Sequence, residues 1–81
     1  MGKYILYVKT SCPYCVQAED LLASRGERAM VIPFDNDLET LDHMKWAYDH
    51  ETVPMIFHVV DSDIKFIGGY TELVVYLDGT R

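Results

Sequence analysis

The chain has few cysteines: there are two in 81 residues, and both belong to one Cys-x-x-Cys motif, Cys12 to Cys15. A secreted domain stabilised by disulfides carries more cysteines spread along its sequence, so that class is excluded. No run of about 18 apolar residues occurs, and no basic leader followed by an apolar stretch is present, so neither a membrane span nor a secretory signal is predicted. We therefore expect a cytoplasmic protein without a membrane partner.

Basic residues are scarce as well, with 7 Lys and Arg against 13 Asp and Glu and a formal net charge of -6. Such a charge repels nucleic acid and anionic lipid, so no nucleic-acid partner is expected, and a protein partner is expected to offer neutral or basic surface. Hydrophobic residues make up 49% of the chain, enough for a small core. We expect residues 1–81 to form a single domain and a monomer.

Apolar periodicity predicts the element order β-α-β-α-β-β-α in an α/β architecture. Residues 4–8 form a nearly unbroken apolar run, typical of a strand that is covered on both faces at the centre of a sheet. Pro13 suits the first position of a helix, which makes Cys12 its N-cap, and Arg25-Gly26 ends that helix. Residues 29–34 read as a second strand, with Pro33 at a sheet edge or at the strand's end.

The second half of the chain continues the pattern. A helix is predicted to start near Asn36 as the capping residue, with Glu39 three positions on, and to stop near Asp49 or His50. The remaining predicted elements are a hairpin of residues 55–60 and 64–67, a break at residues 68–69 and a helix over residues 71–77. A right-handed crossover between the first two strands would place helices on both faces of the sheet.

The Cys12-Pro13-Tyr14-Cys15 motif directly follows the first predicted strand and opens a helix. It places two sulfur atoms one turn apart at the positive end of the helix dipole, and Lys9 adds positive charge three residues upstream. An N-cap side chain accepts hydrogen bonds from amides two or three positions on, so a Cys12 thiolate can accept from Tyr14 and Cys15. These features predict that Cys12 is the nucleophile and that Cys15 is the resolving thiol.

The histidines do not complete a zinc site with this motif. Such a site needs a second Cys-x-x-Cys or two histidines with three to five intervening residues. His43, His50 and His58 are separated by six and seven intervening residues. Thiol–disulfide chemistry is therefore favoured over metal binding.

Thr52-Val53-Pro54 immediately precedes a predicted apolar strand. A proline there is often an ordinary first strand residue. If its peptide bond is cis, the Val53 backbone instead points outward and offers strand-type pairing to an extended peptide.

Gly68-Gly69 precedes Tyr70-Thr71-Glu72 and has two interpretations. The glycines are either a break between strand and helix, or a place where a ligand approaches the backbone. In the second interpretation the helix N-terminus and the Thr71 hydroxyl bind a carboxylate while Glu72 pairs with an amine, which suits the end group of an amino acid.

With these three motifs in this order, the chain resembles the dithiol glutaredoxins, and most closely the compact bacterial and bacteriophage members. The resemblance covers essentially all 81 residues. It implies a thioredoxin fold with a four-stranded mixed sheet of order 2-1-3-4 and a cis Pro54. It also implies no bound cofactor, no metal, and glutathione as the reducing co-substrate.

The resemblance implies roles for individual residues. The first cysteine of the family attacks the substrate disulfide, the second resolves it, and glutathione reduces the enzyme through a mixed disulfide. Val53 would pair with the glutathione backbone, and Thr71 and Glu72 would meet its γ-glutamyl end. The residues implied to bind glutathione are Lys9, Tyr14, Thr52, Val53, Pro54, Gly69, Tyr70, Thr71 and Glu72. Disulfide-containing proteins, ribonucleotide reductase among them, are the implied substrates.

The chain departs from the family pattern after the second helix. Residues 48–51 are acidic and lack the glycine often found before the Thr-Val-Pro motif. Lys45 is the candidate for the basic or amide group that family members supply from that helix. Two alternatives stay open: a redoxin reduced by thioredoxin reductase, against which the Gly69 to Glu72 segment argues, and an iron–sulfur or zinc carrier with Cys12 as a ligand.

Overall fold

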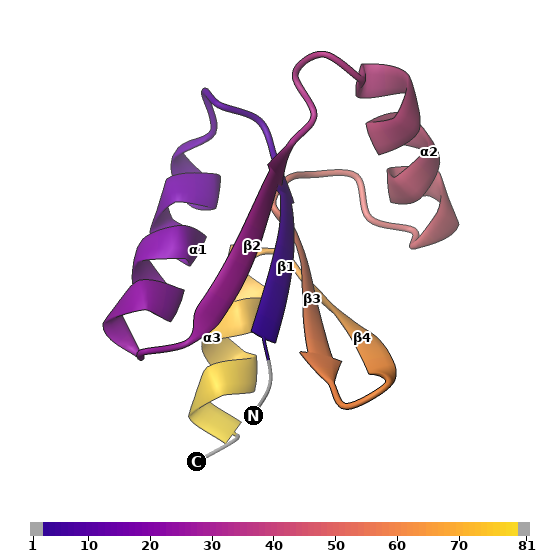
Figure 1. The fold of residues 1–81 in the computed structure, drawn as a ribbon. Helices are drawn as coiled ribbons and strands as arrows, with labels where there is room; N and C mark the ends of the chain where they lie inside the picture. Colours follow the sequence, from indigo (N-terminus) through magenta and orange to yellow (C-terminus); the bar gives the residue numbers. More distant parts are fainter. Residues whose placement is uncertain (1–2, 80–81) are drawn as a thin grey trace.

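A four-stranded mixed sheet forms the centre of the molecule, in the order β2-β1-β3-β4 (Figure 1). The computed structural model describes residues 3–79. The elements are β1 (Lys3–Val8), α1 (Pro13–Ser24), β2 (Arg28–Pro33), α2 (Leu38–Ala47), β3 (Met55–Val60), β4 (Asp63–Gly68) and α3 (Tyr70–Gly79). β2 runs parallel to β1, whereas β3 is antiparallel to both β1 and β4. The predicted element order and sheet order are confirmed.

Strand β1 sends alternate side chains to opposite faces of the sheet. Tyr4, Leu6 and Val8 belong to the core cluster on the face covered by α1 and α3. Ile5 and Tyr7 pack against the cluster on the face covered by α2. The apolar run of residues 4–8 thus forms a central strand covered on both sides, as predicted, and the architecture is that of the thioredoxin fold.

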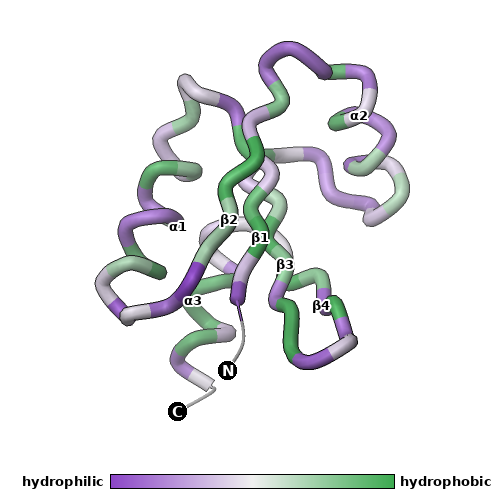
Figure 2. The backbone as a smooth tube through the Cα atoms, in the orientation of Figure 1, coloured by the Kyte–Doolittle hydropathy of each residue, from purple (hydrophilic) through white to green (hydrophobic). Residues whose placement is uncertain are grey.

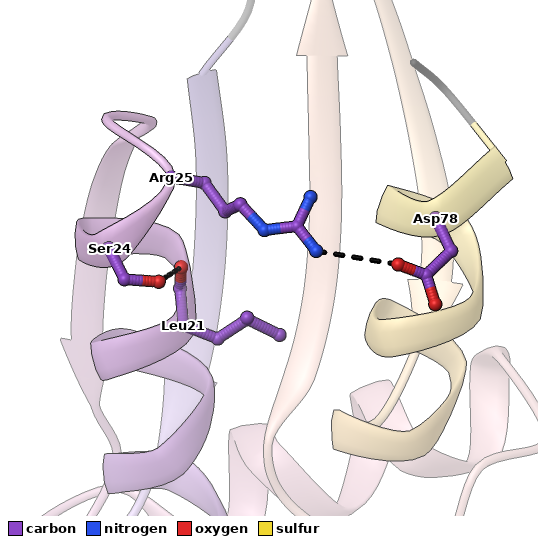
Figure 3. Close-up of polar contacts among 4 residues, drawn as sticks. All are labelled: Leu21, Ser24, Arg25 and Asp78. Atoms are coloured by element: carbon purple, nitrogen blue, oxygen red, sulfur yellow. Dashed lines mark hydrogen bonds and ion pairs between the residues drawn. The ribbon is translucent and has the colours of Figure 1, made fainter.

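The core on the face covered by α1 and α3 is the larger of the two. Helix α1 contributes Cys15, Ala18 and Leu22 to its core, and α3 contributes Leu73 and Leu77. An ion pair between Arg25 and Asp78, 3.4 Å long, also links the end of α1 to α3 (Figure 3). Beside it the Ser24 hydroxyl donates to the Leu21 carbonyl oxygen at 2.7 Å (Figure 3). Helices α1 and α3 therefore form one packed layer.

The opposite face has a smaller core, made of Leu41, Met55 and Phe57. Aromatic rings extend it: Tyr7 lies 5.0 Å from Phe57, and Phe66 lies 5.2 Å from Phe57, between ring centroids. Figure 2 shows hydrophilic segments on both sides of α2, where the chain enters and leaves this helix. Leu41 is the one residue of α2 that is fully buried.

Helix α2 departs from the prediction at both ends. Its N-cap is Asp37 rather than Asn36, because the Asp37 carboxylate accepts from the Thr40 amide at 3.3 Å. The helix ends at Ala47, with Tyr48 as its C-cap, slightly earlier than expected. The break predicted at residues 68–69 is confirmed only at Gly69, which lies between β4 and α3, because Gly68 is the last residue of β4. No helix in the described range, 3–79, is long and apolar enough to cross a membrane.

Helices α1 and α2 end in the same hydrogen-bonded turn, in which the residue after the C-cap adopts a left-handed conformation. In α1 that residue is Gly26, with φ 71°, as the sequence predicted. In α2 it is Asp49, with φ 51°. The next amide, of His50, donates to the Lys45 carbonyl at 2.8 Å and so turns the chain back toward the sheet. The turn after α2 thereby determines where His50 lies.

Candidate active site

Cys12 is the N-cap of α1, with an extended backbone at φ -111° and ψ 108°. Its Sγ accepts a hydrogen bond from the Cys15 amide at 3.2 Å, and Pro13 occupies the first helical turn. The additional bond expected from Tyr14 is not formed within the described part of the chain, where Cys15 supplies the capping amide. The predicted position of this sulfur, at the start of its helix, is confirmed.

The loop that carries Cys12 is tied to the segment after β2. The Thr10 amide donates to both carboxylate oxygens of Asp35 at 3.2 Å, and the Thr10 hydroxyl donates to Oδ1 at 3.1 Å. No local sequence pattern marks Asp35 as part of the site. The predicted topology could have indicated this contact. Asp35 and Thr10 follow two parallel strands, and the carboxyl ends of parallel strands lie at the same edge of the sheet.

Cys15 lies one turn into α1 and is buried in the core between the helix and the sheet. Burial, followed by the hydrogen bond to Cys12, raises the pKa of the Cys15 thiol to about 12, although the Lys9 amide opposes this shift. Both cysteines are free thiols in this structure. Cys15 is therefore a protonated thiol at neutral pH, while Cys12 is half-buried and open to partners.

Val53 lies against the reactive cysteine from the other side. The Val53–Pro54 peptide bond is cis, as the resemblance implied. The Cys12 thiol donates to the Val53 carbonyl oxygen at 3.7 Å, a contact open to a thiol and not to a thiolate. Cys12 thus has an amide donor on its helix side and a carbonyl acceptor on the Val53 side.

A pocket of about 370 Å³ opens in this region. Its lining residues are Tyr14, His50, Thr52, Val53, Pro54, Gly69, Tyr70, Thr71 and Glu72. Eight of the nine residues predicted to bind glutathione therefore share one cavity. Lys9 does not line it and instead contacts the Cys15 sulfur through its backbone amide.

The far wall of the pocket is the start of α3. Glu72 reaches back one turn, and its Oε1 accepts from the Gly69 amide at 2.7 Å, which caps the helix. Gly68 has φ 126°, and a Cβ placed there would lie 2.8 Å from Glu72 Cγ. The packing of the protein itself therefore requires glycine at position 68, because the Glu72 side chain fills the space that a larger side chain would need.

Two tyrosines line the pocket from different elements. Tyr14 comes from the first turn of α1 and is 59% exposed, while Tyr70 is the first residue of α3. Their ring centroids lie 6.0 Å apart, with planes inclined by 30°. Such a pair offers flat apolar surface to a ligand that lies between the two helix starts.

His50 is a pocket residue that the sequence did not reveal. Its Nε2 lies 3.3 Å from the Thr52 hydroxyl, and a Cβ added to Gly69 would lie 3.5 Å from its Cε1. No motif or periodicity marks this histidine, since the turn after α2 brings it to the pocket. Lys45, the candidate for a basic contact, lines a neighbouring groove instead, together with His50. Among residues 3–79, no group of three or more His, Cys, Asp or Glu side chains is arranged to hold a metal ion.

Comparisons with known proteins agree with this geometry. A sequence model described as Glutaredoxin matches residues 4–63. Glutaredoxin 3 of Escherichia coli is 34% identical over 73 residues, which cover 90% of this chain and 83% of that protein. A glutaredoxin-like protein of Encephalitozoon cuniculi is 37% identical over 76 residues, 94% of this chain, and the chain spans 55% of that relative's length.

Solved structures give the same result. The dithiolic glutaredoxin 2-C-Grx1 of Trypanosoma brucei brucei superposes with a TM-score of 0.75 and 32% identity, over 96% of this chain and 79% of the other. Glutaredoxin 1 of Francisella tularensis superposes with a TM-score of 0.69 and 26% identity, over 98% and 95%. With its Cys12-x-x-Cys15 motif at the start of α1, this chain belongs to the glutaredoxin family of thiol–disulfide oxidoreductases.

Proposed function

We propose that this protein reduces protein disulfides and glutathione mixed disulfides, with glutathione as the reducing co-substrate. The observation that carries the proposal is the pocket that joins the Val53 backbone to the N-terminus of α3, with Cys12 Sγ in contact with Val53. An extended peptide can pair with the Val53 backbone. The start of α3 and the Thr71 hydroxyl suit a carboxylate, and the second oxygen of Glu72 suits an amine.

The reaction begins when Cys12, as a thiolate, attacks one sulfur of the substrate disulfide. A new bond forms between the Cys12 sulfur and that sulfur, the old disulfide breaks, and the other sulfur leaves as a thiolate that takes up a proton. With a glutathione mixed disulfide, the product is glutathione bound to Cys12. A second glutathione thiolate then attacks the sulfur of the bound glutathione, releasing oxidised glutathione and the Cys12 thiolate.

Protein disulfides require the second cysteine. After Cys12 has formed a mixed disulfide with the protein, Cys15 attacks the Cys12 sulfur and the substrate thiol leaves. The raised pKa of Cys15, about 12, keeps it protonated until that attack, when its proton passes to the departing sulfur. Two glutathione molecules then reduce the Cys12–Cys15 disulfide. We extend the proposal to a monomer that acts in the cytoplasm, with ribonucleotide reductase among its substrates.

Substitution of each cysteine tests these roles. Cys12→Ser is expected to abolish all turnover, whereas Cys15→Ser keeps the reduction of a glutathione mixed disulfide and loses the reduction of protein disulfides. The assay couples turnover to glutathione and glutathione reductase, with thioredoxin reductase in a parallel arm. Efficient turnover with thioredoxin reductase alone, or equal losses in both variants, would overturn the proposal.

Thr71→Ala tests the carboxylate subsite. We expect the KM for glutathione to rise by at least about tenfold, the loss of one hydrogen bond to a charged group, with kcat little changed. Thr40→Ala is a matched control, because Thr40 also lies in the first turn of a helix but lines no part of the pocket. An unchanged KM in Thr71→Ala would remove this residue from the glutathione site.

A further inference from the structure

A second groove lies beside the substrate pocket, along the C-terminal half of α2. It has a volume of about 650 Å³ and is lined by Asp42, Lys45, Trp46, Asp49, His50 and Glu51. We call it the α2 groove. The proposed reaction at Cys12 uses none of these residues, and His50 alone among them also lines the substrate pocket.

Trp46 is the most exposed large hydrophobic side chain in the described part of the protein. It is 81% exposed, and its ring contacts one other ring, that of His43, at 6.1 Å between centroids. It belongs to neither core cluster. A tryptophan left in solvent costs free energy unless a partner covers it, and tryptophan is enriched among the residues that anchor protein interfaces.

The charges around Trp46 are mostly negative. Asp42, Asp49 and Glu51 contribute three carboxylates to the groove, and Lys45 contributes one ammonium group. None of these four side chains forms an ion pair within residues 3–79. Carboxylates beside an exposed indole suit a guanidinium or ammonium group, which can lie on the ring face and bond a carboxylate with its edge.

The α2 groove adjoins the substrate pocket through one shared residue. His50 forms a wall of both cavities and lies 3.3 Å from the Thr52 hydroxyl. The next residue, Val53, contacts Cys12 Sγ. A polypeptide whose sulfur is attached to Cys12 can therefore extend along the substrate pocket past Val53 and reach the α2 groove at the wall that His50 shares.

We propose that the α2 groove docks the segment next to the reactive cysteine of a protein substrate, and that it selects segments carrying arginine or lysine. An arginine of that segment lies on the face of Trp46 with its guanidinium group toward Asp42 and Glu51. The assignment of this segment to a disulfide substrate rests on the proposed function. The docking itself is a binding event that can be measured without any reaction.

The binding test uses Trp46 as its own reporter, since it is the one tryptophan in the sequence. Its fluorescence is titrated with a seven-residue peptide that has serine in place of the cysteine and two flanking arginines, and with a second peptide that has glutamates at the same positions. We expect the arginine peptide to bind at least about tenfold more tightly at low salt, and the difference to shrink at high salt. Equal binding of the two peptides would overturn the proposal.

Two double variants separate docking from the overall negative charge. Asp42→Asn with Glu51→Gln removes two charges from the α2 groove and is expected to abolish the preference for arginine. Asp61→Asn with Asp63→Asn removes two charges from the tip of the β3–β4 hairpin, the turn and the first residue of β4, at the opposite end of the molecule (Figure 1). This control is expected to keep the preference, and asparagine tolerates the left-handed backbone of Asp61, with φ 54°. Equal losses in both variants would show a long-range charge effect and refute the docking site.

Turnover measurements distinguish failure of the docking site from failure of the proposed function. The same two peptides, now with cysteine restored in place of serine and joined in a disulfide to a second cysteine of the peptide, are compared as substrates with the small mixed disulfide of cysteine and glutathione. We expect kcat/KM to favour the arginine peptide by about tenfold, and the groove variant to lose that preference while it keeps its rate with the small disulfide. Equal rates with both peptides would refute the docking site alone, whereas no turnover of any of the three would refute the proposed function.

Discussion

Helices α1 and α2 begin alike. Each follows a strand, and each is capped by a side chain that accepts from the amide three positions on. Cys12 Sγ accepts from Cys15 at 3.2 Å, and Asp37 Oδ1 accepts from Thr40 at 3.3 Å. The reactive sulfur thus occupies the place that an ordinary capping carboxylate takes in the other helix. The cap of α1 is at once a structural group and the proposed nucleophile.

The two helices differ in how firmly they are attached to the sheet. Helix α1 buries three residues, Cys15, Ala18 and Leu22, whereas α2 buries Leu41 alone. The firm helix holds the sulfur in place beside Val53. The loosely attached helix leaves its outer surface, with Trp46 and its neighbouring carboxylates, free for a partner. The firmly packed helix α1 thus carries the sulfur that exchanges bonds, and the less buried helix α2 carries the surface that we propose recognises the substrate.

The largest expected effect comes from truncating the buried leucine of each helix. Leu22→Ala should lower the free energy of unfolding by about 2–5 kcal/mol, because it opens a cavity in the larger core, between the sheet and helices α1 and α3. Leu41→Ala should lower the free energy of unfolding by about 2 kcal/mol. It should also let α2 unfold locally before the rest of the protein, because no other residue of α2 is fully buried. Denaturant titration measures the first change and amide hydrogen exchange the second. Equal protection of α1 and α2 in Leu41→Ala would contradict the difference in attachment.

A smaller effect is expected where the two helices end. Asp49→Gly should stabilise the protein by about 1 kcal/mol, because glycine adopts the left-handed backbone of Asp49, φ 51°, without a side-chain penalty. The reciprocal change, Gly26→Asp, should destabilise by a similar amount. A Cβ at Gly26 meets no atom within 4 Å, so the backbone conformation alone is tested. Thermal unfolding of both variants would show shifts of opposite sign, and shifts of the same sign would contradict this account.

The last effect appears only at high pH and concerns the buried thiol of α1. The pKa of Cys15 is raised to about 12 from an ordinary value of 9.0. The unfolded chain therefore loses this proton at a lower pH than the folded protein, so the stabilisation is complete below about pH 9 and declines as the pH rises toward 12. Reduced Cys15→Ala should lose less stability than the reduced parent between pH 8 and pH 10. Parallel curves for the two proteins would show that Cys15 does not titrate as an isolated buried thiol.

Local sequence patterns predicted the elements well where one residue type has one strong preference. Pro13 located the start of α1, and Gly26 located its end. The start of α2 was less certain, because Asn36 and Asp37 are both good capping residues and local sequence does not choose between them. Asp49 was harder still, since an aspartate seldom marks a left-handed turn.

The sequence by itself determined the element order, the central position of β1, and the place of Cys12 at the start of a helix, because each follows from preferences of neighbouring residues. Tertiary structure alone decided that Asp35 holds the loop before Cys12, that His50 closes the pocket, and that Trp46 stays in solvent. Asp35 and Thr10 are 25 positions apart in the chain, and contacts of that kind depend on how strands and helices pack rather than on any local pattern.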